Sequence, residues 1–439
     1  MDFQTKTQRP LFLKAICLVA ALMLYQIGFG QEPYAKFESF KFELDESFEL
    51  ENTELSENDI NRIAQAQEEM KADSWSLKYW NDSYPSYRWH QILIEASKNH
   101  KGHKNGGRVA IMHLAIYDAM VEVWKHKKAY PQKAASQLDS RIELLSQEPE
   151  YSTFICEWSA AAGAAQLVIS HYFPEQSDFI DSRLEEFKLA RLATGIQTPS
   201  DIEKGLEIGR KIAEKYIQYA KDDRTDIQWT GTVPEADSLW SGNPGPWDPM
   251  KRQWKPLTLL QADQFRPAPP PTDWTADMEE LRKFNAENDY SEIAWKWKSE
   301  PIWDLTLERK ILEYGLSPLE SAYAAAVFHT ARFDGIIAAW DGKYNYWGIR
   351  PFQYDPDFKP ILIDTPNFPG YPAGHTTVAG SLSRVLAFLF PKDEQLFYEM
   401  ASECSESRFE GGVHFRTDNE VGLEVGYQVG QQVIDTFNQ

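Results

Sequence analysis

Apolar residues recur at helical spacing through most of the chain beyond residue 58. In the run 105–125, for example, the residues Val109, Met112, Ile116, Ala119 and Val123 follow one another at intervals of three and four. This spacing places the side chains on one face of a helix. Comparable patterns predict helices over 58–72, 105–125, 155–172, 176–192, 199–221, 277–287, 305–342, 375–390 and 418–436. Alternating apolar segments bounded by turn pairs do not repeat, so we expect an all-α fold, a large helical bundle with at most a short hairpin.

One long segment, 225–275, interrupts the helical pattern. It is dense in Pro, Gly and Trp, and Pro and Gly exclude a regular helix. An irregular segment of this length is usually functional or a linker, and its tryptophans favour a loop packed over a helical body. The expected organisation is an N-terminal helical part at 58–224, this Pro/Trp-rich loop at 225–275, and a C-terminal helical part at 276–439.

The first thirty residues have the pattern of an export signal. Basic residues precede an apolar run over 15–24, and small residues follow up to Gly30. The run is too short to span a bilayer comfortably, and no later segment is apolar enough to cross a membrane. We therefore expect a signal peptide at 1–30 that is cleaved near Gly30, an acidic and poorly ordered lead-in at 31–57, and an exported protein without a stable membrane span.

Charge and cysteine content exclude several classes of function. The formal net charge is −21, and so acidic a chain is a poor partner for nucleic acid. Beyond the apolar run only Cys156 and Cys404 are present, which excludes a disulfide-built scaffold and a cysteine-based zinc site. Whether these two cysteines pair is left open by their spacing.

Three short clusters carry residues suited to chemistry. In the first, Lys343 and Arg350 are seven positions apart near the end of an Ala-rich helix, so both would face one spot if the helix persists through them. In the second, Gly374 and His375 open a helix, where free N–H groups and the positive end of the helix dipole favour an anion. Read singly, these clusters could be solvated cations and a tight turn with a surface histidine.

The third cluster contains Arg408, His414 and Asp418. His414 and Asp418 are four positions apart, which is one helical turn on a single face. A carboxylate at one ring nitrogen of histidine leaves the other nitrogen as a nucleophile or metal ligand. A buried His–Asp pair can also be purely structural. Together, the three clusters supply cations, an anion-binding helix end and two histidines, which is what a tetrahedral or five-coordinate oxyanion requires.

In their order and spacing, the clusters resemble the signature of type 2 phosphatidic acid phosphatases and vanadium-dependent haloperoxidases, K-x6-RP, PSGH and SR-x3-G-x-H-x3-D. The sequence from about residue 85 onward, which has a helical pattern, resembles the bacterial haloperoxidase-like branch more loosely. The resemblance implies that the oxygens of vanadate or phosphate are bound by Lys343, Arg350, Arg408 and the backbone N–H of Gly374.

The resemblance also implies roles for the two histidines. His414 would bind vanadium as the metal ligand, or attack phosphorus in a phosphatase, Asp418 would orient it, and His375 would act as acid and base. Lys343 would assist catalysis as well as bind the anion. The family serine is Ala373 here, so one hydroxyl donor to the oxyanion is missing, at a cost of about 1–3 kcal/mol.

Two aromatic residues favour the haloperoxidase branch. Phe368 lies five positions before Ala373 and Trp340 three before Lys343, and both resemble aromatics near the halide in that branch, although they could be plain core residues. We expect a vanadate-dependent haloperoxidase that converts halide and hydrogen peroxide to hypohalous acid, with a homodimer plausible for this branch. The alternatives are a secreted acid phosphatase that cleaves phosphate esters through a phosphohistidine at His414, and a non-catalytic helical binding protein with a degenerate site.

Other histidines carry weaker signals. His100 and His103 lie in a polar, basic loop, where metal binding is a minor alternative to a solvated surface. His113 and His329 lie in apolar helical text and are interpreted as packed core residues.

Overall fold

The computed structural model describes residues 37–44, 55–98, 107–147, 152–242, 245–299, 301–362 and 364–438. The chain divides into two compact units, Met1–Ser39 and Phe40–Gln439, and every helix named below belongs to the second. Among the described residues, regular secondary structure is helical, and β-structure is limited to one isolated bridge between Leu239 and Gly348. The all-α class is confirmed, and the described residues contain no hairpin.

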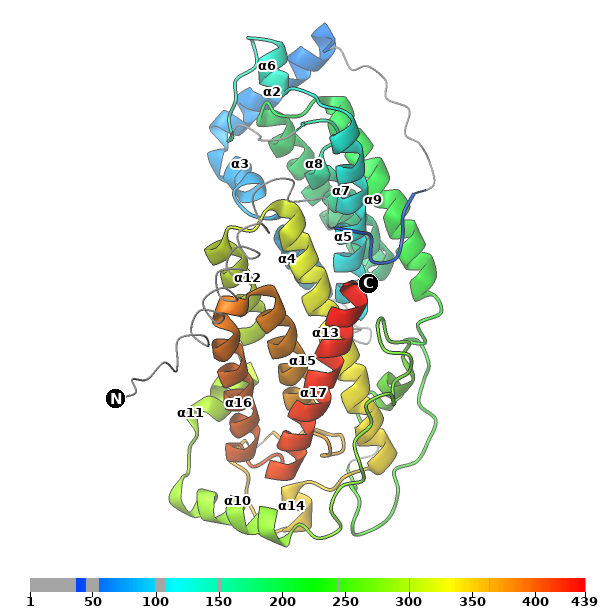
Figure 1. Ribbon diagram of the computed structural model, residues 1–439, viewed down its shortest axis with the longest axis vertical. Coiled ribbons are helices and arrows are strands. Elements are labelled where there is room, and N and C mark those ends of the chain that lie inside the picture. Colours follow the sequence, from blue (N-terminus) through cyan, green and yellow to red (C-terminus); the bar gives the residue numbers. More distant parts are fainter. Residues whose placement is uncertain are drawn as a thin grey trace, which may run out of the picture. The chain divides into compact units, whose positions relative to one another are not determined.

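The helices fall into two sets along the chain, which the long loop separates, and further long connections span 139–156 and 355–373 (Figure 1). The first set is α2 (Glu57–Ala72), α3 (Ser74–Asn81), α4 (Pro85–Lys98), α5 (Gly107–Ala129), α6 (Ala135–Leu138), α7 (Glu157–Tyr172), η1 (Pro174–Gln176), α8 (Ser177–Ala193) and α9 (Pro199–Ala220). The second set is η2 (Pro249–Gln253), α10 (Thr275–Glu287), α11 (Glu292–Ser299), α12 (Ile302–Tyr314), α13 (Pro318–Tyr346), α14 (Pro351–Tyr354), α15 (Gly374–Leu389), η3 (Pro391–Asp393), α16 (Glu394–Glu410) and α17 (Arg416–Phe437).

The prediction of a single helix over 305–342 is wrong. The chain breaks there into α12 and α13, because Gly315 takes a left-handed conformation at the end of α12 with φ of 60°. Ser317 then caps α13 in a reciprocal capping box with Glu320, and Pro318 occupies the first helical position. These signals for the end of one helix and the start of the next are present in the local sequence. The prediction missed the break because apolar residues continue on both sides of it.

Several helices were not predicted from the apolar pattern, namely α3, α4, α11 and α16. The omission of α16 matters most, because this helix carries Arg408. Its buried residues include Cys404, Ser407 and Arg408 beside Phe397 and Ala401. A core-facing stripe with this composition gives little aliphatic periodicity, so the signal used for the other helices is weak here.

Helix α13 connects the two sets of helices. It packs against α5 from the first set and against α15 and α17 from the second, as Figure 1 shows. Its residues are buried on almost all sides, which is typical of a helix in the centre of a large bundle. The C-terminal end of α13 carries Trp340 and Lys343, so the candidate site lies at the end of the central helix.

Glycines on α17 allow α15 and α17 to pack closely, as the four-residue interval of Gly422, Gly426 and Gly430 suggested. A Cβ atom at Gly426 would overlap the Thr377 carbonyl oxygen of α15 and lie 2.9 Å from the Cα of Gly380. Both helices carry residues of the candidate site near their N-terminal ends, Gly374 and Asp418. The close packing of these helices therefore holds the two ends in register.

Replacing Gly426 by alanine should destabilise the fold by about 1–3 kcal/mol, because the added methyl group cannot be placed without moving α15. Chemical denaturation followed by circular dichroism measures this change. Glu424→Ala, at an exposed position of the same helix, is the matched control and should change stability by less than about 0.5 kcal/mol. Equal stability of the two variants would contradict the packing argument.

The Pro/Trp-rich segment runs beside α13 and is tied to it by hydrogen bonds. The buried Asp334 carboxylate accepts bonds from the backbone N–H groups of Leu257 and Thr258, both at 2.8 Å. Nearer the site, the Tyr344 hydroxyl donates to the Trp247 carbonyl at 2.6 Å. The described part of this segment thus packs on the helical body, while the domain limits at 224 and 275 stay a prediction.

The predicted export signal at 1–30 lies outside the described residues, so it stays a prediction, as do cleavage near Gly30 and most of the 31–57 lead-in. His100 and His103 also lie outside them. None of the described helices is long and apolar enough to cross a membrane. Cys156 and Cys404 are both buried and unpaired.

Candidate oxyanion site

Lys343 and Arg350 come together by a route that differs from the predicted one. Helix α13 does not persist to Arg350, because Trp347 adopts a left-handed conformation with φ of 51° and ends the helix at Tyr346. Arg350 instead precedes the short helix α14 as its N-cap residue. The two side chains are both fully buried, so they are not the solvated cations of the alternative reading.

A single loop, 368–370, positions both cations through its carbonyl groups. The Lys343 Nζ donates to Pro369 O at 2.8 Å and to Gly370 O at 2.7 Å. The Arg350 Nε donates to Phe368 O at 2.9 Å. An ammonium group has three N–H donors, so one donor of Lys343 is left for a ligand.

Burial without a neighbouring anion raises the free energy of the charged forms of Lys343 and Arg350. The pKa of Lys343 is lowered well below its ordinary value by burial and by the neighbouring Arg350. Burial also lowers the pKa of Arg350 to about 10. An anion that binds beside such desolvated cations stabilises their charged form.

The N-terminal end of α15 provides backbone donors. Ala373 is its N-cap residue and makes no side-chain cap, so the N–H groups of the first turn have no capping side chain. A Cβ atom at Gly374 would lie 3.2 Å from the Trp340 ring and 3.3 Å from Cε of Lys343. Gly374 therefore lets the helix end approach the lysine closely, and such an end favours an anion.

His414 and Asp418 pair, although they do not share one helical turn as predicted. His414 precedes α17, and Asp418 lies at the third position of that helix. The distance from His414 Nδ1 to Asp418 Oδ2 is 3.0 Å, and the same oxygen accepts the Phe415 N–H at 3.2 Å. Both side chains are buried. The Asp418 carboxylate is therefore held by the His414 ring on one side and by the Phe415 N–H on the other.

This pairing determines which nitrogen of His414 is free. Burial, followed by the charges of Arg350 and Lys343, holds the pKa of His414 well below its ordinary value, so the ring is neutral. With Nδ1 facing the carboxylate, we assign the proton to Nδ1 and the lone pair to Nε2. Nη1 of Arg350 lies 3.4 Å from Nε2 and donates a long hydrogen bond to this lone pair. Burial raises the pKa of Asp418 to about 7, and Lys343 and Arg350 oppose this rise.

Arg408 is the third buried cation of the site. Its Nε donates to Ser407 Oγ at 3.0 Å and one terminal nitrogen donates to Ala294 O at 2.8 Å. The charge of Arg408 acts on both His375 and His414, as do those of the other two cations. The sequence-predicted cations and histidines are therefore brought together in one electrostatic environment.

His375 lines a cavity of about 350 Å³, together with Gly374. His375 is solvent-exposed, whereas His414 is buried. Desolvation by the surrounding protein lowers the pKa of His375 to about 3, and the positive charges of Arg408 and Lys343 make a smaller contribution in the same direction. His375 is therefore neutral near neutral pH and able to accept a proton from a molecule in the cavity.

The wall of this cavity contains both predicted aromatic residues. Trp340 and Phe368 pack with ring centroids 5.3 Å apart, and the Trp340 Nε1 is buried without a hydrogen-bond partner among the described residues. The sequence did not single out Asp304 and Arg332, which also line the cavity and form a two-pronged ion pair with both N–O distances at 2.7 Å. These two residues are 28 positions apart on different helices, and no motif connects them.

Oxyanion binding should take up protons. The pKa values of Lys343, His375 and His414 are all depressed, and a bound anion favours the protonated form of each. Affinity for sulfate, whose own charge is constant near neutral pH, should therefore fall as pH rises, by up to about tenfold per pH unit for each proton taken up. Titration calorimetry in buffers of different ionisation enthalpy counts these protons, and zero uptake would contradict the assigned neutral states.

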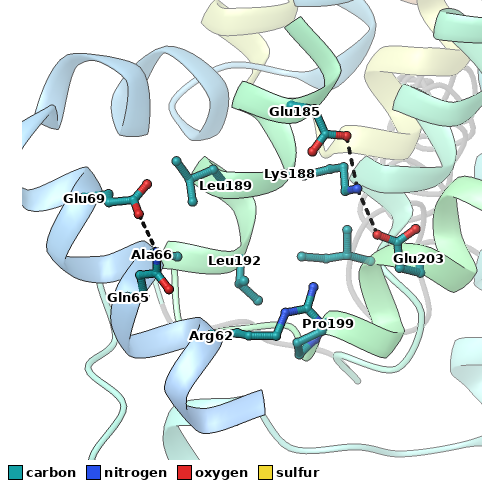
Figure 2. A pocket seen from close by; sticks show the side chains of 11 residues that line it. Arg62, Gln65, Ala66, Glu69, Glu185, Lys188, Leu189, Leu192, Pro199 and Glu203 are labelled. Atoms are coloured by element: carbon teal, nitrogen blue, oxygen red, sulfur yellow. Dashed lines mark hydrogen bonds and ion pairs between the residues drawn. The ribbon is translucent and has the colours of Figure 1, made fainter. Parts of the chain in front are cut away.

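A separate surface pocket contains none of the predicted site residues. Figure 2 shows it between α2, α8 and the start of α9. Lys188 there forms ion pairs with Glu185 at 3.2 Å and Glu203 at 3.1 Å. The charge of Lys188 is thus neutralised within the pocket, and the carboxylates of the pocket would repel an oxyanion.

Comparison with known proteins agrees with the fold and with the third cluster. Residues 395–439 match the family model for the second helical-bundle domain of VCPO, and this range holds Arg408, His414 and Asp418. No curated protein sequence matches the chain significantly.

Most of the chain is similar in fold to solved bacterial structures. A vanadium-dependent iodoperoxidase is 21% identical with a TM-score of 0.59, over 86% of this chain and 95% of its own. A holo-type vanadium-dependent chloroperoxidase is 17% identical with a TM-score of 0.54, over 76% of this chain and 92% of its own. The chain thus has the fold of the bacterial vanadium-dependent haloperoxidases, which confirms the resemblance to the vanadium haloperoxidase and type 2 phosphatidic acid phosphatase superfamily.

Proposed function

We propose that the protein is a vanadate-dependent haloperoxidase that oxidises halide with hydrogen peroxide. The observation that carries this proposal is the environment of His414. A neutral imidazole has its Nδ1 held by Asp418, and its Nε2 lone pair faces the buried cations, with Nη1 of Arg350 at 3.4 Å. This arrangement suits a metal oxyanion that needs one nitrogen ligand and positive charge at its oxygens.

The donor set fits vanadate. His414 would be the metal ligand through Nε2, and the oxyanion oxygens would accept hydrogen bonds from the spare N–H of Lys343, from Arg350 and Arg408, and from the start of α15 at Gly374. The aspartate behind the ligand is the kind of partner that fixes a metal-bound histidine and increases its basicity.

Bound vanadate would supply the centre at which hydrogen peroxide becomes able to oxidise halide. The protein's own part is fixed charge, orientation and proton movement. His375 faces the cavity and would accept a proton from hydrogen peroxide, since a bound anion raises its depressed pKa. Lys343 would keep its proton once the anion is present, and its positive charge would draw electron density from the reacting oxygen.

We further propose that halide approaches along the wall formed by Trp340 and Phe368. This wall borders the cavity next to Gly374 and His375, and the Trp340 Nε1, which has no hydrogen-bond partner within the described part of the chain, would donate to an anion. Export after cleavage near Gly30 and a homodimeric state are parts of the same proposal, tested by N-terminal sequencing of the mature protein and by light scattering.

One comparison tests the proposal. Purified protein is incubated with orthovanadate and assayed for oxidation of iodide, bromide and chloride by hydrogen peroxide, and without vanadate for phosphate-ester hydrolysis. Halide oxidation that needs vanadate supports the proposal. Hydrolysis inhibited by vanadate, without halide oxidation, would overturn it in favour of a phosphatase, and neither activity together with no vanadate binding would favour a degenerate site.

Replacing Ala373 by serine should strengthen vanadate binding. The serine would restore a hydroxyl donor at the start of α15, and one hydrogen bond to a charged group contributes about 1.5–3 kcal/mol, or about tenfold to 150-fold in affinity. Equilibrium dialysis with vanadium analysis measures the change. Ala373→Thr would add the hydroxyl with an extra methyl group, and unchanged affinity in both variants would show that position 373 does not face the anion.

A further inference from the structure

Three histidines from three helices gather at the contact between the two sets of helices. They are His90 of α4, His113 of α5 and His329 of α13. The distance from His90 Nδ1 to His113 Nε2 is 3.0 Å. Each residue has a ring nitrogen that lies within 4.8 Å of the corresponding atoms of the other two. The burial expected for His113 and His329 is confirmed, but their sequence positions gave no sign of this cluster.

Hydrogen bonding within the protein does not satisfy the cluster. The Nδ1 atoms of His113 and His329 are buried and have no hydrogen-bond partner among the described residues. Buried polar atoms are nearly always paired in folded proteins, so unpaired ones need an explanation. A metal ion near the three rings would provide one, because the lone pair of a neutral imidazole is a common metal ligand.

We propose that His90, His113 and His329 bind a divalent transition-metal ion, and that the ion is zinc. Zinc accepts three imidazole nitrogens at about 2.0–2.1 Å, with a fourth position for water or an anion. The ring centroids are 4.3, 5.0 and 5.3 Å apart. The ring planes are inclined to one another by 10°, 21° and 30° in the same order. An imidazole nitrogen binds along a lone pair in its ring plane, so the three rings would have to turn about their side-chain bonds to direct these lone pairs at one ion, and the ligand nitrogens already lie within 4.8 Å of one another.

The surroundings suit a site with an open fourth position. His90 is only half-buried, so water can complete the coordination from its side. Asp304 lies near enough for its negative charge to act on His90, opposed by Arg332. Because these two residues pair with each other, the three neutral histidines would hold the charge of the ion without a carboxylate ligand.

The ion would join α4 and α5 to the central helix α13. His329 and Lys343 lie on the same helix, so a metal at the cluster would stiffen the helix that carries a cation of the oxyanion site. This role does not depend on the proposed peroxidase activity, and its test needs no turnover.

The test uses the full chain without a polyhistidine tag, stripped of metal and titrated with zinc. We expect one zinc ion per chain and a higher melting temperature with zinc than without it. Cobalt, used as a spectroscopic probe, should give the visible absorption of a site with imidazole ligands. Loss of an outer-shell partner costs about 10–100-fold in metal affinity, so His90→Gln, which removes a ligand, should weaken zinc binding by about 100-fold or more.

Two controls distinguish this site from other histidines. His171→Gln changes an exposed histidine of α7 and should leave zinc affinity unchanged. His414→Ala should also leave it unchanged, which separates the metal site from the oxyanion site. If His113→Gln or His329→Gln fails to fold, the cobalt spectrum and His90→Gln still decide the question. The absence of stoichiometric zinc binding by the wild type, or full affinity in His90→Gln, would overturn the proposal.

Discussion

Replacing His414 by alanine should abolish vanadate binding and halide oxidation while leaving the helical fold intact. The reason is that His414 Nε2 carries a lone pair that faces the buried cations, while Asp418 holds the other ring nitrogen. Loss of a residue that only orients a metal ligand costs about 10–100-fold, so loss of the ligand itself should cost at least about 100-fold in vanadate affinity. Equilibrium dialysis and the halide assay measure both effects.

A graded variant distinguishes a metal ligand from a structural histidine. Asp418→Asn keeps the size of the side chain but removes the charge that faces His414 Nδ1, so it should lower vanadate affinity by about 10–100-fold. Imidazole added to His414→Ala should restore part of the binding, because a free ring can occupy the space left by the side chain. Wild-type halide oxidation by His414→Ala, or a larger loss in Asp418→Asn than in His414→Ala, would contradict the assignment.

Lys343→Met should be the second most damaging substitution for oxyanion binding. Methionine nearly matches the shape of the lysine side chain, but it removes a charge that is fully buried. Removing one partner of a buried, hydrogen-bonded charge pair costs about 2 kcal/mol or more, which is about 30-fold in affinity. Sulfate, phosphate and vanadate should all be affected, since the interaction depends on the charge of the anion.

The same variant tests whether the lysine serves the anion or the fold. Lys343 also donates to Pro369 O and Gly370 O, so Lys343→Met should alter loop 368–370 and stability should be measured beside affinity. Lys392→Met, an exposed lysine in η3, is the matched control and should bind all three anions normally. Unchanged anion affinity in Lys343→Met, with a lower melting temperature, would assign the lysine to structure alone.

The spacing of residues in the sequence predicted much of the site. The order of Lys343, Arg350, His375, Arg408 and His414 predicted an oxyanion pocket because charged side chains and a glycine-opened helix occur at fixed intervals. The structure brings these residues together, though by local geometry that differs from the expected one. Arg350 lies beyond the end of α13, and His414 precedes α17.

The amino-acid sequence by itself determined the all-α class, most of the helices and the identities of the charged residues. These features depend on periodicity and on neighbours in the chain, which a sequence displays directly. Only the tertiary structure decided that carbonyl groups of loop 368–370 hold both cations, that Asp304 and Arg332 border the cavity, and that three distant histidines meet. Such contacts join helices that lie far apart in the sequence, and they form only when the packing of the whole bundle fixes where each helix lies.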